Sequence, residues 1–255
     1  MITIKSVLTQ IEYKIFRVLE EFHILEYRDF LEVEKISTDL FYDLSKFVER
    51  DPAAKSLDYV LNSYNCFKAI ISYRVANKLF YFQTENRREK QFLETKARQI
   101  SEDAKSQTGI EIHPAAKIDH GFVIDHGYGT VIGETTVIGK NCYILQGVIL
   151  GAKGIANNQN NKRHPTLKDN VQIGAFAKIL GNITIGSNVF IGPNCTVTKD
   201  IFSNAKIVIS SQIQNIKHRY LSLQSSNNEL TTKKIYTPLA LGFIYTSSMQ
   251  KQLAY

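Results

Sequence analysis

The feature that most constrains this chain is a series of aliphatic residues spaced six apart between positions 112 and 197. The series reads Ile112, Ile118, Ile124, Ile132, Ile138, Ile144, Leu150, Leu167, Ile173, Ile179, Ile185, Ile191 and Val197. Antiparallel strands would show an alternation of period two joined by hairpin turns. A sustained hexapeptide period instead predicts a parallel β-helix.

In such a fold, six residues form one face of a triangular prism and three faces complete one coil. Successive coils stack at the ~4.8 Å spacing of neighbouring strands. The aliphatic series would then form a continuous internal ladder, with smaller residues such as Ala116, Cys142 and Cys195 pointing inward beside it. The period alone does not fix the hand of the coil.

Two interruptions break the period. Ile124 and Ile132 are eight residues apart, which adds two residues to one turn. Leu150 and Leu167 are seventeen apart, so residues 151–166 must leave the prism as an excursion loop. This loop is polar and rich in Asn, and long loops on rigid scaffolds frequently carry function.

The chain before the repeats has the pattern of a helical domain, so the whole chain divides into three parts. Apolar residues at helical spacing occur in 7–22, 40–48 and 57–79, with a possible N-cap at 37–39 and a stop at Arg50-Asp51-Pro52. We expect a helical domain over 1–108, a β-helix domain over 109–210 and an irregular tail over 211–255. The third apolar stretch is interpreted as one helix, and the charged segment 84–105 as a solvated helix leading into the prism.

Composition excludes several classes of protein. The chain has 255 residues, 44% of them hydrophobic, and a formal charge of +7 that is dispersed and accompanies no nucleic-acid motif. Three cysteines show neither metal-binding nor disulfide spacing. The first twenty residues contain charges that interrupt any secretory core, and no run approaches the ~20 apolar residues of a membrane span. We therefore expect a cytoplasmic protein that does not bind nucleic acid or membranes.

Several motifs together resemble the serine O-acetyltransferases of cysteine biosynthesis. They include Asp125-His126-Gly127, Gly133-Glu134-Thr135 and Arg163-His164-Pro165, with Arg50-Asp51-Pro52 upstream. The likeness covers about residues 40–200. It implies an α+β chain whose helical domain precedes a left-handed parallel β-helix, and an activity that transfers acetyl from acetyl-CoA to L-serine.

The resemblance also implies a role for individual residues. His126 matches the general base that takes the proton of the serine hydroxyl. Glu111 occupies the place of an Asp that orients this imidazole, one coil below it. Asp51 and Asp125 match the carboxylates that hold the substrate ammonium. Arg163 and His164 match the pair that faces its carboxylate, for which a guanidinium can bind both oxygens.

The donor site and the assembly follow from the same resemblance. Gly151, Ala152 and Lys153 stand where the family has Gly-Gly-Thr, and Ala175 matches a small residue that meets the pantetheine arm. Acetyl-CoA would lie in a groove between adjacent prisms of a homotrimer or a dimer of trimers. Family members can dock a C-terminal Ile onto O-acetylserine sulfhydrylase; this chain ends in Tyr255, which argues against that complex.

Two alternatives remain open, and two others are disfavoured. The acceptor could be another amino acid or a sugar hydroxyl, or the chain could be a non-catalytic subunit that binds a partner. A zinc site of the kind found in some β-helix carbonic anhydrases is disfavoured, because His120 and His126 would point from neighbouring faces of the prism. Transfer through an acyl-cysteine is also disfavoured, because Cys142 and Cys195 are expected to point into the core.

Overall fold

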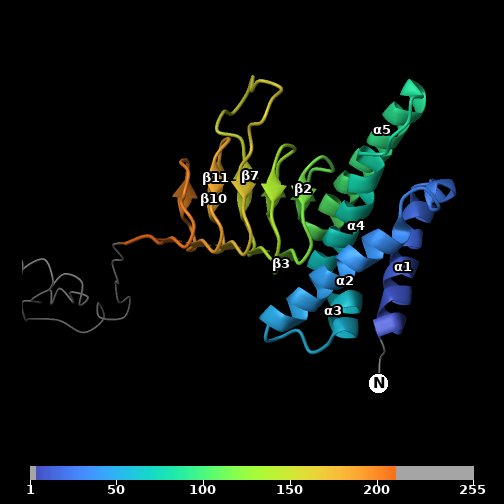
Figure 1. The fold of residues 1–255 in the computed structure, drawn as a ribbon, viewed down its shortest axis with the longest axis horizontal. Coiled ribbons are helices and arrows are strands. Elements are labelled where there is room, and N and C mark those ends of the chain that lie inside the picture. The colour runs from blue at the N-terminus through green and yellow to red at the C-terminus, as the bar shows by residue number, and fades with distance from the viewer. Residues whose placement is uncertain (1–3, 211–255) are drawn as a thin grey trace, which may run out of the picture. The chain divides into compact units, whose positions relative to one another are not determined.

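The computed structural model describes residues 4–210, which contain a group of helices followed by stacked coils (Figure 1). The helices are α1 Ile4–Glu21, the 3₁₀ turn η1 Leu25–Tyr27, α2 Val33–Arg50, α3 Leu57–Ser63, α4 Asn65–Phe80 and α5 Arg87–Thr108. The expected tail over 211–255 lies outside the described residues. No helix among residues 4–210 is long and apolar enough to cross a membrane.

The helix predictions were correct in outline and wrong at two boundaries. The expected N-cap at 37–39 lies inside α2, because buried Ile36 extends the apolar face one turn toward the N-terminus. The stretch 57–79 is two helices, separated at Tyr64, whose backbone is extended. The Tyr64 ring packs edge-on against Phe47 at 5.2 Å, and its hydroxyl donates to Asp51. These side-chain contacts hold Tyr64 outside either helix.

The coils contain short parallel strands in three sheets. Sheet A contains β1 Glu111–Ile112, β4 Val131–Ile132, β7 Ile149–Gly151, β10 Lys178–Leu180 and β13 Thr196–Val197. Sheet B contains β2 Lys117–Ile118, β5 Val137–Ile138, β8 Thr166–Leu167 and β11 Thr184–Ile185. Sheet C contains β3 Val123–Ile124, β6 Tyr143–Ile144, β9 Gln172–Ile173, β12 Phe190–Ile191 and β14 Lys206–Ile207.

The core of the prism is the predicted ladder. Ile112 pairs with Ile132 and Ile132 with Leu150 in sheet A, and the other sheets stack their aliphatic residues in the same register. Every member of the hexapeptide series is at most 7% exposed, and Cys142 and Cys195 are buried beside it. The parallel β-helix prediction is therefore confirmed, and both cysteines point into the core as expected.

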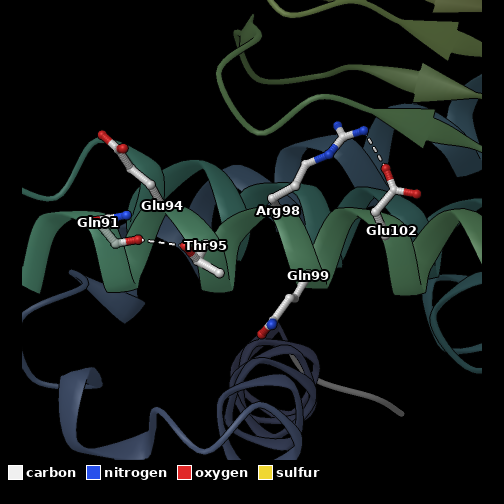
Figure 2. A pocket seen from close by; sticks show the side chains of 6 residues that line it. All are labelled: Gln91, Glu94, Thr95, Arg98, Gln99 and Glu102. Carbon is white, nitrogen blue, oxygen red and sulfur yellow. Dashed lines mark hydrogen bonds and ion pairs between the residues drawn. The ribbon is translucent and has the colours of Figure 1, made fainter.

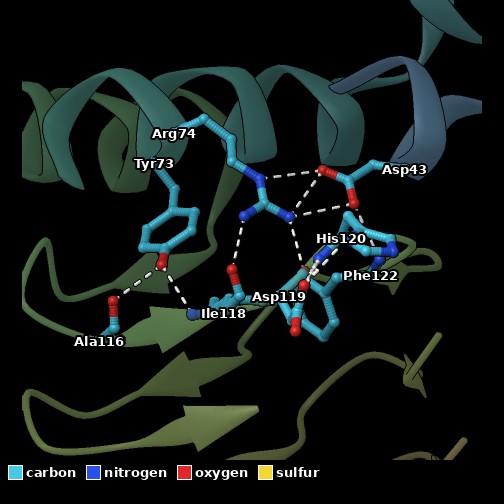
Figure 3. A network of polar contacts seen from close by, with 8 residues as sticks. All are labelled: Asp43, Tyr73, Arg74, Ala116, Ile118, Asp119, His120 and Phe122. Atoms are coloured by element: carbon cyan, nitrogen blue, oxygen red, sulfur yellow. Dashed lines mark hydrogen bonds and ion pairs between the residues drawn. The ribbon is translucent and has the colours of Figure 1, made fainter. Parts of the chain in front are cut away.

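The helices are attached to the first coil by buried polar contacts (Figure 3). Arg74 on α4 pairs with Asp43 on α2 and donates to the carbonyls of Ile118 and Asp119 at 2.6 and 2.8 Å. Asp43 also accepts the backbone N–H of Phe122 at 2.8 Å. Because a buried ion pair is costly to break from one side, this network fixes α2 relative to the first coil.

Candidate active site

The site residues lie on two edges of the prism, which we name after the sheets they join. The C–A edge holds the turns that lead from sheet C to sheet A, and the A–B edge holds those from sheet A to sheet B. His126 lies in the turn between β3 and β4, on the C–A edge. Arg163 and His164 end the excursion loop before β8, on the A–B edge.

The turn that carries His126 is the one lengthened by two residues. His126 has a φ of 59°, and Gly127 follows with a φ of 76°. At most other left-handed positions of the coils the chain places Asn or Gly, which adopt this conformation at little cost. Phe176 and His126 are the exceptions among the described coil residues. The His126 side chain is 73% exposed, so the turn presents an imidazole outward rather than packing it.

One carboxylate lies beside this imidazole, and a second lies near the first. Asp125 Oδ2 is 4.0 Å from His126 Nε2 and accepts a hydrogen bond of 2.9 Å from the Tyr143 hydroxyl. Asp51, which follows α2, accepts from the Tyr64 hydroxyl at 3.2 Å and from the backbone N–H of Ala53 at 2.8 Å. The helices thus bring Asp51 to the same corner as Asp125 and His126.

The negative charges of the two carboxylates act together on the pKa values of two neighbouring tyrosines. Burial raises the pKa of Tyr64, and the negative charges of both Asp51 and Asp125 raise it further. The pKa of Tyr143 is raised by the same causes. Within residues 4–210, no lysine or arginine forms an ion pair with either carboxylate. This corner therefore offers two carboxylates that pair with no lysine or arginine of the described residues, and the nearby Arg50 guanidinium lies over the Tyr143 ring instead.

The A–B edge is organised by Gly133-Glu134-Thr135. The Thr135 hydroxyl accepts the backbone N–H groups of Arg163 and His164, both at 3.0 Å, and the Arg163 guanidinium pairs with Glu134. His164 packs against Gly133 so closely that an added Cβ would overlap the ring. The motif therefore fixes the end of the excursion loop to the turn below it.

The protonation of His164 follows from its contacts. Its Nδ1 accepts the backbone N–H of Thr135 at 3.1 Å, which assigns the proton to Nε2 in the neutral ring. Burial, followed by the positive charge of Arg163, lowers its pKa from an ordinary value near 6.5 to about 4. His164 is thus a hydrogen-bond donor at neutral pH, not a cation.

Lys162 anchors the same loop end. Its Nζ donates to the carbonyl oxygens of Thr135 and Pro165. Burial lowers the pKa of this ammonium to about 8. Three consecutive residues, Lys162 to His164, thus contact the turn that contains Thr135, while the middle of the loop is exposed.

Glu111 does not make the contact predicted for it. Its carboxylate pairs with Lys105 Nζ at 2.6 Å and lies 3.7 Å from Arg98 Nη2, both on α5. No hydrogen bond or ion pair joins it to His126 in the described part of the chain. Since α5 runs directly into β1, its basic residues reach Glu111 first. The carboxylate beside the imidazole is that of Asp125.

The predicted donor residues are also divided between the edges. Gly151 ends β7 and is followed by Ala152 and Lys153 on the A–B edge, whereas Ala175 lies in the turn between β9 and β10, on the C–A edge. One face of six residues spans up to ~20 Å at the rise of a strand. The structure therefore groups Asp51 with Asp125 and His126, and Arg163 with His164, but does not bring the two groups together within one chain.

Two hollows on the surface of residues 4–210 have neither group in their lining. One of about 530 Å³ runs along α5 and is lined by Gln91, Glu94, Thr95, Arg98, Gln99 and Glu102 (Figure 2). Arg98 and Glu102 pair there, and Arg98 is the residue that also approaches Glu111. Among residues 4–210, no group of three or more His, Cys, Asp or Glu side chains is placed to hold a metal ion.

Comparison with known proteins first defines the class. Two family models match the coils: "Bacterial transferase hexapeptide (six repeats)" over residues 164–199 and "Hexapeptide repeat of succinyl-transferase" over residues 129–155. The chain is thus a hexapeptide-repeat transferase by fold and by sequence.

The family within this class follows from relatives that match 65% of this chain. A serine acetyltransferase of Staphylococcus aureus is 45% identical over 166 residues, which cover 65% of this chain and 72% of that protein. One from Synechococcus elongatus is 45% identical over a similar length, and the match spans 63% of it. The chain belongs to the serine acetyltransferase family.

Solved structures agree with the assignment of the fold. A serine acetyltransferase of Neisseria gonorrhoeae in complex with serine has a TM-score of 0.66 and 30% identity, with 82% of each chain covered. Isoform 3 from Entamoeba histolytica, in complex with cysteine, has a TM-score of 0.65 and 37% identity, covering 83% of this chain and 74% of that one. The left-handed β-helix expected from the resemblance is therefore the fold of this chain.

Sequence reasoning missed several residues of the site. Glu134 and Thr135 stood in a motif that had been recognised but given no role, and their contacts with Arg163 and His164 supply one. Tyr64 and Tyr143 had no role either. Tyr143 could have been noticed, because it is an aromatic residue at an outward position of the repeat.

Proposed function

We propose that this protein transfers the acetyl group of acetyl-CoA to the hydroxyl of L-serine, giving O-acetyl-L-serine for cysteine synthesis. The observation that carries the proposal is a pair of neighbouring carboxylates, Asp51 and Asp125, which pair with no lysine or arginine among the described residues, with Asp125 beside the exposed imidazole of His126. A small zwitterion with a hydroxyl fits this chemistry: its ammonium binds the carboxylates while its hydroxyl meets the imidazole.

The reaction is a direct transfer in one ternary complex. His126 takes the proton of the serine hydroxyl as that oxygen attacks the thioester carbonyl. The tetrahedral intermediate then collapses, the carbon–sulfur bond breaks, and the sulfur leaves as the thiol of CoA after receiving a proton. A cysteine nucleophile is not required, and burial raises the pKa of the Cys142 thiol to about 12.

The serine carboxylate is bound by Arg163 and His164 of a second copy. Arg163 carries more donors than its contact with Glu134 uses, and the Nε2 proton of His164 is available for a carboxylate oxygen. These residues lie on the A–B edge, whereas His126 lies on the C–A edge. The A–B edge of each copy must therefore meet the C–A edge of its neighbour. Repeating this contact around a threefold axis closes a trimer with three equivalent sites.

The donor lies in the same groove between copies. Small residues at Gly151 and Ala152 on one edge, and Ala175 on the other, leave the backbone accessible to an extended arm such as pantetheine. A single chain does not bring the residues of the two edges together, so it does not form the complete donor site. Acetyl-CoA therefore has the same requirement for two copies as the serine.

The direct test of the reaction is release of CoA thiol from acetyl-CoA. We expect release that depends on L-serine and is far slower with L-threonine, L-homoserine or simple sugars at equal concentration. A faster reaction with one of those alcohols would assign a different acceptor. Absence of thiol release with every acceptor, while the protein remains folded, would reject the proposal.

The shared site has its own test. His126→Ala and Arg163→Ala should each be nearly inactive alone, because each removes one half of every site. When the two are unfolded together and reassembled, mixed trimers contain sites in which both halves are intact, and activity should reappear. Reassembly of each variant by itself is the matched control, and a mixture as inactive as its components would place the site within one chain.

A further inference from the structure

Tyr143 projects outward from β6, directly over the strand that leads into Asp125. It pairs in register with Val123, and its hydroxyl donates to Asp125 Oδ2 at 2.9 Å. The Arg50 guanidinium lies over the Tyr143 ring, 5.9 Å from its centre, and donates to the carbonyl of Asn141 at 3.0 Å. Arg50 therefore fixes the ring and is itself held on the backbone, with no ion pair to Asp125 among the described residues.

Tyr64 repeats the arrangement from the helical side. It lies between α3 and α4, and its hydroxyl donates to Asp51 Oδ2 at 3.2 Å. Its ring is held edge-on between Phe47 and Tyr59. Each of the two carboxylates thus has one oxygen bonded to a tyrosine whose ring is packed and cannot easily turn.

Both hydroxyls donate to a carboxylate here. Burial and the two negative charges raise the pKa of Tyr64 and of Tyr143, so each keeps its proton through the neutral range. A phenol that donates to a carboxylate orients that group without neutralising it. The charge needed to attract an ammonium is retained, while the freedom of the carboxylate to rotate is lost.

We propose that Tyr143 and Tyr64 are positioning residues that hold Asp125 and Asp51 ready for the amino group of the acceptor. This inference rests on the proposed function and adds to it the selection for a cationic amine. Neither tyrosine touches the reacting atoms; each acts through its carboxylate. The preference for an amino acid over a simple hydroxy acid is therefore set partly by two phenols.

The test compares Tyr143→Phe and Tyr64→Phe with the wild-type protein. Loss of one hydrogen bond to a charged group corresponds to roughly tenfold or more in binding, so the KM for L-serine should rise by that factor. The kcat at saturating serine and the KM for acetyl-CoA should change less than about twofold. Tyr81→Phe is the matched control, because that hydroxyl donates to the carbonyl of Ala115, away from both carboxylates.

Two further readouts separate positioning from a merely structural role. The ratio of kcat/KM for L-serine to that for 3-hydroxypropanoate, which lacks the amine, should fall in Tyr143→Phe. In an Asp125→Asn background, Tyr143→Phe should cause little further loss, because the group it positions has already lost its charge. Thermal unfolding of each variant verifies that the protein is folded.

The outcomes are distinguishable. If the wild-type protein shows no serine-dependent thiol release, the proposed function fails and this inference fails with it. If the wild type is active and Tyr143→Phe leaves the KM for serine and the acceptor ratio unchanged, only this inference is overturned. A fall in kcat equal for both acceptors, together with a lower melting temperature, would make the tyrosines structural and also overturn it.

Discussion

His126 and His164 lie on two edges of one prism, and their surroundings are opposite. His126 is 73% exposed on a turn with positive φ, whereas His164 is buried with its Nδ1 bonded to Thr135. A base that must take up a proton needs a free nitrogen lone pair. A group that must bind a carboxylate needs a fixed N–H. The comparison shows how the same side chain is assigned two roles by exposure and by one backbone hydrogen bond.

The sharpest test of this difference removes the exposed imidazole. His126→Ala should lower kcat by about 10²- to 10⁴-fold, the usual contribution of a general base, with a smaller effect on the KM for serine. The measurement is thiol release at saturating substrates. His120→Ala is the control, because that ring pairs with Asp119 and packs on Tyr42, away from the carboxylate pair. If His126→Ala keeps more than a tenth of the wild-type rate, His126 is not the general base.

The second prediction displaces the buried imidazole without changing it. In Gly133→Ala the new methyl would overlap the His164 ring, which must then leave its bond to Thr135. We expect the KM for serine to rise about tenfold or more, because a hydrogen bond to a charged group is lost. Gly192→Ala is the matched control, since a Cβ there would lie 3.3 Å from Ile207 and Val208, a far smaller conflict than at Gly133. An unchanged KM in a folded Gly133→Ala protein would argue against His164 as a ligand.

The third prediction concerns the loss of stability in acid that the buried His164 causes. Burial lowers the pKa of His164 to about 4, so the unfolded chain takes up this proton first as the pH falls below about 6.5. The stability that depends on a neutral His164 is fully present above pH 6.5 and is lost as the pH falls toward 4. Urea unfolding between pH 7 and pH 4 should show a shallower loss in His164→Gln than in the wild type. Identical slopes would contradict the burial argument.

The smallest effect is expected at Glu111. Its partners are Lys105 and Arg98, so Glu111→Gln should lower kcat no more than a few-fold and change the free energy of unfolding by about 1 kcal/mol or less, as for other exposed pairs. Steady-state rates and urea unfolding measure both. A loss of kcat comparable to that of His126→Ala would restore the orienting role that the sequence suggested for this residue.

The coils could be predicted almost residue by residue because their signal is local. Each aliphatic residue of the series occupies an inward position, and the predicted loop 151–166 is one residue too long at each end, because Gly151 still belongs to β7 and Thr166 already belongs to β8. The helical region was less predictable. The break at Tyr64 depends on contacts with Phe47 and Asp51, which are distant in sequence and leave no trace in the apolar pattern.

The site was predicted as a set of residues but not as an arrangement. The identities of Asp51, Asp125 and His126 followed from motifs, and the structure gathers those three. The partners of Glu111 could not be predicted, because they depend on how α5 meets β1. The separation of His126 from His164 was within reach: counting faces from Ile124 and from Leu167 assigns the two histidines to different edges of the prism.

The attachment of the helices to the first coil has a consequence beyond the site. A stack of parallel strands ends in a row of unpaired backbone groups, which invites another stack to join it and form a fibre. Here the carbonyls of Ala116 and Ile118 accept hydrogen bonds from Tyr73 and Arg74 on α4 (Figure 3). The carbonyl of Ile112 accepts one from Ser101 on α5. The helical region thus caps the first coil of the β-helix. It prevents a second molecule from pairing with that end.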